Sequence, residues 1–375
     1  MEKKILLVAG DPSGDLHGAN LVKELKKILP EIKIFSLGGL HLAGVSDCFL
    51  HNLVELAVFG LGDSIKNYFL FREIFQKIVL TFLDSEKLVA VVPINFYGFN
   101  IHLAQAAKEQ NIPVVYYISP QVWASRPGRV KKLARFIDKM LVILPFEEEI
   151  YRRAGVETVF VGHPLLDLIP PLPSTINYQP STVNCRIGLL PGSRKAIISR
   201  HLPLIFEIAK EIKRIFPESK FLLPWTKNMP YSYLEKMVKK SPVDISLVYD
   251  ENYQSRRKCE IAFACSGTAT LENALLGIPT IVIYKTTWFF YFLGRLLVKV
   301  PYIGLVNILS GKNLFPEFVQ HQAKTEKIVE KAITWLKEPS SLEEIRSELF
   351  NLRKKLGQPG VSLRAAEEII KCIAD

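Results

Sequence analysis

The segment at residues 8–20, VAGDPSGDLHGAN, combines glycines with acids and a histidine. Its glycine spacing, between an apolar run and an amphipathic one, resembles a strand-to-helix turn that holds phosphate. The segment carries Asp11, Asp15 and His17 but no lysine, and carboxylates repel phosphate. We therefore expect this loop to face a hydroxyl group, with these three side chains as candidate general bases. Ser13 is a candidate substrate contact.

Polar residues also follow other expected strands of the first half, in INFYGFN (94–100) and ISPQVWASRPGR (118–129). Asparagine, tyrosine, tryptophan and arginine together suit the binding of a sugar or alcohol. The candidate substrate contacts are Asn100, Trp123, Arg126 and Arg129. Trp123 either stacks on a sugar ring or packs in the fold, and the two arginines are candidates for binding an acceptor phosphate.

The second half contains a glycine turn after an apolar run in IGLLPGSRKA (187–196). The turn consists of Gly192, Ser193 and Arg194, and a helical pattern follows it. A guanidinium at such a turn is well placed to bind a diphosphate through two hydrogen bonds.

A second turn of this type lies in CEIAFACSGTATLE (259–272). Ser266, Gly267 and Thr268 precede a helical pattern, and the free N–H groups of a helix start attract anions. Glu272, about one turn into that helix, is placed to accept hydrogen bonds from ribose hydroxyls. Two such turns in one domain predict a site for a nucleoside diphosphate, although each alone is also compatible with a plain capped helix.

Other common site types have no support in the sequence. There is no GKS or GKT, which argues against a P-loop NTPase, and no GxGxxG followed by a ribose-binding acid, which argues against a dehydrogenase. The five cysteines are scattered and form no CxxC pair, as expected for reduced thiols in a cytosol. We expect neither a metal site nor a cofactor.

The elements that carry these residues alternate between short β-branched runs and amphipathic stretches, which predicts α/β domains with parallel sheets. We expect a domain at 1–169, a Pro/Ser/Thr-rich linker at 170–183 and a second domain at 184–360. A last helix at about 361–375 is expected to pack back on the first domain. Two doubly wound, Rossmann-like domains facing each other would form a cleft, with ligands at the carboxyl ends of the strands.

The formal net charge of +11 fits an anionic partner, but no basic stripe interleaved with aromatic residues indicates nucleic acid. Basic and apolar residues lie together at 69–83 and 288–299, which indicates an anionic membrane surface or, alternatively, helices packed in a core. No segment has the uninterrupted apolar length of a membrane-spanning helix, and the N-terminus does not read as a secretory signal.

Ordered motifs along nearly the whole chain resemble the lipid-A-disaccharide synthase family, the inverting glycosyltransferases of Gram-negative lipid A assembly. The motifs are VAGDPSGDLHGA, ELAVFG (55–60), YYISPQVWA, LPFEEEIY (144–151), VGHPLLD, LLPGSR, CSGTATLE and VNILSGKNLFPEFVQ (306–320). Each motif is modest alone, and their order makes the resemblance strong.

The resemblance implies a GT-B fold, with the acceptor in the first domain and the UDP-sugar in the second. It implies transfer of 2,3-diacylglucosamine from UDP to 2,3-diacylglucosamine 1-phosphate (lipid X), forming a β-1,6 disaccharide and UDP. It also implies a metal-independent, cytoplasmic enzyme peripheral to the inner membrane, with Asn307 and Glu317 added to the UDP-binding residues. The sequence leaves a homodimer open.

This chain departs from the family pattern in the loop after its VAVVP run. Where the family has an acid-rich ID-x-PDFN, this chain has Asn95 and Gly98 in place of the two acids, the second of which is a candidate base. The family's glutamate at Asp11 is shortened, a tryptophan is replaced by Ser125, and a glutamate is replaced by Ile197. Another GT-B transferase, a UDP-sugar epimerase or a non-catalytic UDP-sugar- or lipid-binding homologue therefore remain as alternatives.

Overall fold

Apolar, β-branched runs of the first half form a parallel sheet of seven strands in the order β3-β2-β1-β4-β5-β6-β7. The computed structural model describes residues 3–58, 64–125, 128–171, 185–227, 229–297 and 300–374. The strands are β1 (Lys4–Ala9), β2 (Lys33–Gly38), β3 (Cys48–Asn52), β4 (Leu88–Ile94), β5 (Val115–Tyr117), β6 (Lys139–Val142) and β7 (Glu157–Phe160). The chain reverses its direction of winding between β1 and β4, which makes this edge the switch point where doubly wound sheets bind ligands.

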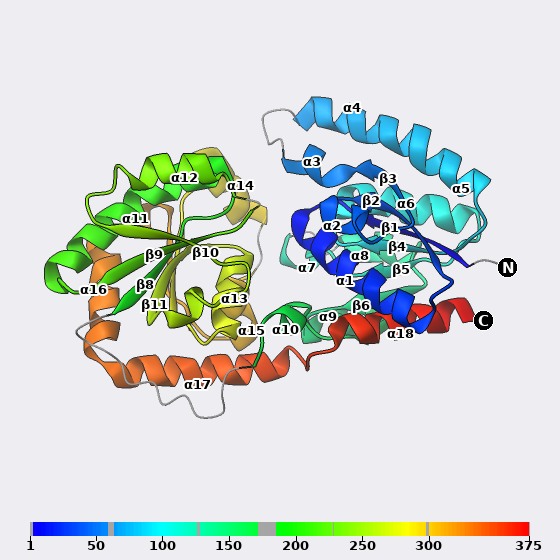
Figure 1. Ribbon diagram of the computed structural model, residues 1–375. Helices are drawn as coiled ribbons and strands as arrows, with labels where there is room; N and C mark the ends of the chain where they lie inside the picture. Colours follow the sequence, from blue (N-terminus) through cyan, green and yellow to red (C-terminus); the bar gives the residue numbers. More distant parts are fainter. Residues whose placement is uncertain are drawn as a thin grey trace. The chain divides into compact units, whose positions relative to one another are not determined.

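Helices pack on this sheet and, with it, form the part that we call unit 1, Met1–Asp167 with Leu356–Asp375 (Figure 1). They are α1 (Pro12–Ile28), α2 (Leu40–Ala43), α3 (Leu53–Val58), α4 (Ser64–Ile74), α5 (Thr81–Ser85), α6 (Tyr97–Glu109), α7 (Val122–Ser125), α8 (Gly128–Ala134), α9 (Pro145–Arg152), α10 (Leu165–Leu168) and α18 (Val361–Ala374). A π-helical stretch, Phe75–Leu80, joins α4 to α5.

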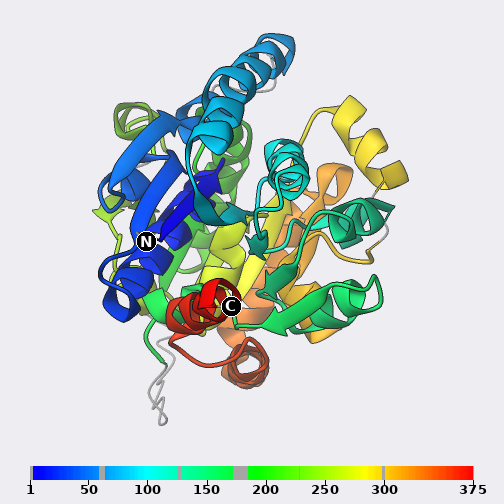
Figure 2. The same ribbon diagram turned by 90° about the vertical axis from the view of Figure 1, so that its right-hand side faces the viewer.

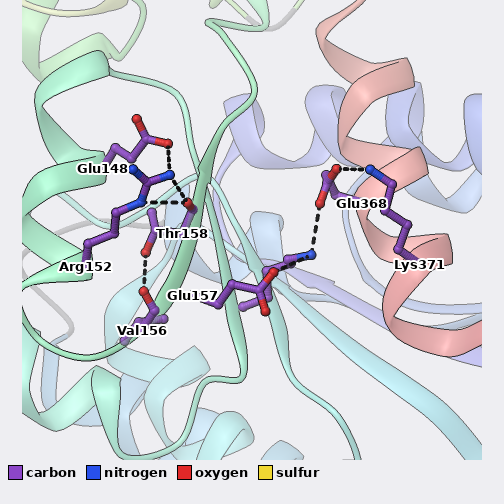
Figure 3. Close-up of polar contacts among 8 residues, drawn as sticks. Glu148, Arg152, Val156, Glu157, Thr158, Glu368 and Lys371 are labelled. Atoms are coloured by element: carbon purple, nitrogen blue, oxygen red, sulfur yellow. Dashed lines mark hydrogen bonds and ion pairs between the residues drawn. The ribbon is translucent and has the colours of Figure 1, made fainter. Parts of the chain in front are cut away.

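The C-terminal helix α18 packs against α1 in unit 1. Figure 2 shows α18 in red, near the N-terminal segment. Asp167 caps it, because its carboxylate accepts hydrogen bonds from three backbone N–H groups, those of Gly360, Val361 and Ser362. On the sheet side, Nζ of Lys139 lies 2.8 Å from Glu157 and 2.9 Å from Glu368 of α18 (Figure 3). Segments at the two ends of the chain thus pack together in one unit.

The remainder, Leu168–Lys355, forms unit 2 around six parallel strands in the order β10-β9-β8-β11-β12-β13. The strands are β8 (Arg186–Leu190), β9 (Lys220–Trp225), β10 (Ile245–Tyr249), β11 (Ile261–Cys265), β12 (Thr280–Tyr284) and β13 (Glu317–Val319). The helices are α11 (Lys195–Ile215), α12 (Tyr231–Val238), α13 (Thr268–Leu275), α14 (Trp288–Leu297), α15 (Leu305–Ser310), α16 (Thr325–Lys337) and α17 (Pro339–Lys355). The winding here reverses between β8 and β11.

Two doubly wound, parallel α/β sheets are the fold that the sequence predicts, and this prediction is confirmed. The division between the units falls at Asp167 and Leu168, and Leu356 onward belongs to unit 1. Most of the expected linker lies outside the described residues. Across the described ranges, no helix combines the length and apolar character that crossing a membrane would need.

Candidate active site

Asp11 stands at the switch point of unit 1, directly after β1, as the N-cap of α1. Its Oδ1 accepts a hydrogen bond of 2.9 Å from the backbone N–H of Gly14, and its Oδ2 accepts one of 2.9 Å from the amide of Asn95, which follows β4. The side chain is partly exposed. A carboxylate has four lone-pair positions, so Asp11 retains the capacity to accept a proton from a substrate hydroxyl.

Asp15, by contrast, is buried and serves the backbone. Its Oδ1 accepts from the N–H groups of Gly39 (2.7 Å) and Leu42 (3.1 Å), and its Oδ2 accepts from that of His41 (3.0 Å). These bonds hold the first turn of α2 against α1. The arrangement favours a structural role for Asp15 and leaves it little access to a substrate.

His17 is also buried, on the side of α1 that faces His163 and Asp167. Burial lowers the pKa of His17 to about 4, against the smaller opposing effect of Asp167. Burial, helped by the neighbouring His17, lowers the pKa of His163 to about 3. Both imidazoles are therefore neutral at neutral pH, but their burial separates them from any bound substrate.

Asn100 and Gly98 lie in the first turns of α6, after β4. Nδ2 of the buried Asn100 lies within 3.3 Å of the carbonyl oxygens of Val8, Ile94 and Asn95, so this amide joins the ends of β1 and β4. Gly98 is exposed, and a Cβ built there would have no atom within 4 Å. The fold thus leaves room for the acid that the family carries at this position.

The remaining candidates of unit 1 have different surroundings. Ser13 is exposed at the start of α1. The guanidinium of Arg129 lies 4.2 Å from the ring centre of Tyr97, next to Gly98. The indole N–H of Trp123 donates to Glu147, so Trp123 is tied into the fold. Arg126 lies outside the described residues.

The two glycine turns of unit 2 follow the neighbouring strands β8 and β11, at the switch point of this sheet. Gly192 has φ +107°, and a Cβ there would lie 2.6 Å from Ile197 and 3.9 Å from Cβ of Cys265, which ends β11. Glycine is therefore required at this approach. The turns place four exposed residues at one edge, together with the partly exposed Ser266: Ser193, Arg194, Gly267 and Thr268.

The acidic and amide side chains expected at the nucleoside already have protein partners. Glu272 pairs with the buried Arg256 at 2.5 Å. Glu317 accepts from the N–H groups of Ile303 and Gly304 at 2.9 Å each, which fixes the segment just before α15. Nδ2 of Asn307 donates to the carbonyl of Phe315 and to Glu317. These residues shape the edge next to the turns.

Comparison with known proteins identifies the family. A family model described as lipid-A-disaccharide synthetase matches residues 5–372. The chain belongs to the lipid-A-disaccharide synthase family. It is 39% identical to the synthase of Syntrophus aciditrophicus, over 97% of this chain and 96% of that protein. It is 36% identical to the synthase of Nitrosococcus oceani, over 94% and 92%.

Solved structures share the fold of this lipid-A-disaccharide synthase family member at low identity. The UDP-GlcNAc 2-epimerase of Neisseria meningitidis bound to UDP-GlcNAc is 16% identical, with a TM-score of 0.64 over 98% of this chain and 100% of that one. The MurG protein of Acinetobacter baumannii is 13% identical, with a TM-score of 0.61 over 98% and 99%. The fold is of the GT-B type. The family is one of glycosyltransferases with a UDP-sugar donor and a lipid acceptor, and its match favours synthase activity over the epimerase and non-catalytic alternatives.

The contacts of two buried side chains, His201 and Glu147, could not be predicted from the sequence. His201 of α11 has its Nδ1 2.9 Å from the carbonyl of Ile197, and its Nε2 accepts a 2.9 Å hydrogen bond from the N–H of Lys285, after β12. Glu147 of α9 binds residues of another loop. A histidine and a glutamate within helical patterns give no signal of such contacts, which depend on the packing of distant segments.

The two segments expected at a membrane surface, 69–83 and 288–299, differ in how far their apolar side chains are exposed. Phe75 and Phe82 pack on the core of unit 1, where Phe75 meets Phe99 and Phe82 meets Phe35. For these two rings the structure supports the alternative of packing in a core, whereas Phe69 and Leu70 of the same segment are 60% and 37% exposed. Within the second segment, Trp288, Phe292 and Leu296 of α14 are 56%, 60% and 81% exposed. Residues 298 and 299 lie outside the described residues.

Proposed function

We propose that this chain transfers 2,3-diacylglucosamine from its UDP donor to 2,3-diacylglucosamine 1-phosphate, forming a β-1,6 disaccharide and releasing UDP. The observation that carries the donor side is the pair of glycine turns at the switch point of unit 2, one of them bearing the exposed Arg194. The UDP-GlcNAc bound by an epimerase of the same fold fits this assignment.

The diphosphate of UDP is assigned to the starts of α11 and α13. Neither helix start has a side chain hydrogen-bonded as a cap in the structure described, so their first N–H groups are available to an anion. Arg194, the N-cap of α11, supplies a positive charge beside them. Together these groups would stabilise the negative charge that develops on UDP as it leaves.

The acceptor hydroxyl is assigned to the switch point of unit 1, with Asp11 as the general base. The 6-hydroxyl oxygen attacks the anomeric carbon of the donor while its proton passes to Asp11, and the bond from that carbon to the UDP oxygen breaks. Of the three candidate bases, only Asp11 is not buried. Asp15 and His17 then support the helix that carries it.

Arg129 is the candidate for binding the acceptor phosphate. It is partly exposed and stacks on Tyr97, one residue before Gly98, at the same edge as Asp11. A guanidinium fixed by stacking loses little conformational freedom when it binds a phosphate.

The membrane-facing element is α14. Trp288, Phe292 and Leu296 are spaced four apart, so they share one helix face. An exposed apolar face on a chain with a net charge of +11 fits attachment to an anionic membrane surface, where an acylated substrate resides. We propose a peripheral location on the cytoplasmic side of the inner membrane.

The function is tested with purified protein by UDP release from acylated and deacylated donor. A synthase built for acylated substrates should lose most of its rate with the deacylated donor. Equal rates with both donors would support a transferase for soluble sugars, and UDP binding without any product would support a non-catalytic homologue.

A further inference from the structure

We propose that Glu147 is a positioning residue for acceptor binding, which holds the loop 118–125 in the conformation that the acceptor site needs. The proposal rests on the assignment of the acceptor to unit 1. Glu147 comes from the motif LPFEEEIY and the loop from YYISPQVWA, and neither motif has a part in the mechanism above.

Glu147 binds this loop through one carboxylate oxygen and the start of its own helix through the other. The side chain is only 1% exposed. Its Oε1 accepts hydrogen bonds from Oγ of Ser119 (2.6 Å) and Nε1 of Trp123 (2.9 Å), and its Oε2 accepts from the N–H of Leu144 (3.1 Å). Only the last of these bonds belongs to the cap of α9. The other two reach a different segment.

The backbone next to Ser119 is strained and needs such support. Ile118 has φ +61°, a left-handed conformation that is rare and costly for a β-branched residue. Such a conformation persists only where the surrounding contacts impose it. Glu147 supplies such contacts on the C-terminal side of Ile118 through Ser119 and Trp123.

This loop is in direct contact with the proposed catalytic edge. The backbone N–H of Asn95 donates to the carbonyls of Tyr117 and Ile118, each at 3.1 Å. The side chain of the same Asn95 donates to Asp11. A change in the loop after β5 therefore reaches the loop after β4 and its contact with the proposed base.

The ionisation of Glu147 makes its hydrogen bonds to the loop 118–125 sensitive to pH. Burial raises the pKa of Glu147 to about 7, against the hydrogen bonds from Ser119, Trp123 and the backbone of Leu144 and Ile143. Tyr151, on the same helix, is the titratable neighbour, and its own pKa is raised by burial and by Glu147. No charged side chain contributes to the shift of Glu147 among the described residues. The ionised carboxylate accepts all three bonds, whereas the protonated acid gives up acceptor capacity.

The matched pair that tests this proposal is Glu147→Gln and Glu149→Gln. Glu149 is on the same helix but is exposed and pairs with Arg153. Because a hydrogen bond to a charged group contributes about 1.5–3 kcal/mol, we expect Glu147→Gln to raise the KM for the acylated acceptor about tenfold or more. The KM for the UDP donor should stay within about twofold, and Glu149→Gln should behave as the parent.

A pH profile separates positioning from mere stability. In the parent, kcat/KM for the acceptor should fall as the pH drops below about 7, and in Glu147→Gln this limb should be absent because the glutamine does not titrate. Should Glu147→Gln fail to fold, Trp123→Phe removes one bond to Glu147 and keeps an aromatic ring. A lower melting temperature with both KM values unchanged would overturn the proposal. An effect on the donor KM alone, or a parent without product, would instead contradict the proposed function.

Discussion

The amide of Asn95 donates a hydrogen bond of 2.9 Å to Oδ2 of Asp11, and this contact joins the two loops at the switch point of unit 1. In the family pattern an acid stands at Asn95, which would place two carboxylates together. Here an amide supports a single carboxylate. This relationship makes Asp11 the focus of the first prediction.

Replacing Asp11 by asparagine should reduce UDP release about a hundredfold or more, the contribution expected of a general base. The melting temperature should fall only modestly, because asparagine is also a good N-cap. Asp15→Asn is the matched control, and it should lower the melting temperature more, because it weakens three buried backbone contacts. Activity of Asp11→Asn within a few fold of the parent would exclude Asp11 as the base.

Gly98→Asp should increase the rate of UDP release by about tenfold or more, because it places an acid at the edge of unit 1 that carries Asp11, the proposed base. The site has room, since a Cβ there meets no atom within 4 Å. An acid in the first turn of α6 should also stabilise the helix by about 0.3–1 kcal/mol. Gly98→Asn has the same shape without the charge, and equal rates for the two variants would argue against a catalytic acid at this position.

In unit 2, His201→Phe should weaken UDP binding about tenfold and leave the acceptor KM unchanged. The ring of His201 fixes the N–H of Lys285 and lies beside Cys265, the residue before the Ser266 turn. Loss of its acceptor leaves a partly buried N–H without a partner, which costs about 1–3 kcal/mol. Calorimetric titration with UDP measures the change. His321 is an exposed histidine of the same unit, so His321→Phe is the control. Equal affinities of the two variants for UDP would disprove a role of His201 in UDP binding.

The contribution of His17 to the free energy of unfolding should fall as the pH is lowered from 6.5 to 4. Over this range the unfolded chain binds a proton at His17, with a pKa of 6.5, that the folded chain, with a pKa of about 4, does not bind. The stabilisation is thus present above pH 6.5 and is lost on acidification, with a slope of about 1.4 kcal/mol per pH unit for each such histidine. Urea unfolding at several pH values should show that the free energy of unfolding changes less per pH unit in His17→Leu than in the parent. The same slope in both proteins would refute the burial of a neutral imidazole.

The exposed face of α14 should be required for membrane binding. Replacing Trp288, Phe292 and Leu296 together by glutamine should lower the affinity for anionic vesicles more than tenfold, because each side chain contributes about 1.5–3 kcal/mol when buried in lipid. The melting temperature should hardly change, because these side chains are exposed. Leu363→Gln removes an exposed leucine elsewhere and should leave vesicle binding intact. Unaltered sedimentation of the triple variant with vesicles would remove α14 from the proposed surface.

The strands and the two glycine turns of unit 2 could be predicted from the sequence, because apolar runs bounded by glycine reflect local constraints. The Gly192 turn illustrates this, since its positive φ demands glycine whatever lies around it. The sequence also indicates correctly that polar loops follow the strands.

The surroundings of individual side chains could not be read in this way. Asp15 is removed from the substrate by the N–H groups of α2, which lie well beyond it in sequence, and His17 is buried near Asp167. Glu272 forms an ion pair with Arg256, and no sequence motif indicates this pairing. Such contacts depend on how distant segments pack, and a local pattern contains no record of them.

The most direct test of the central claim is mass spectrometry of the product formed from UDP-2,3-diacylglucosamine and 2,3-diacylglucosamine 1-phosphate, with parent protein and Arg194→Met. The account predicts a tetra-acylated disaccharide 1-phosphate with one UDP released per product, and a large loss of product in the variant. Unchanged substrates with the folded parent, or an epimerised donor in place of a disaccharide, would contradict it.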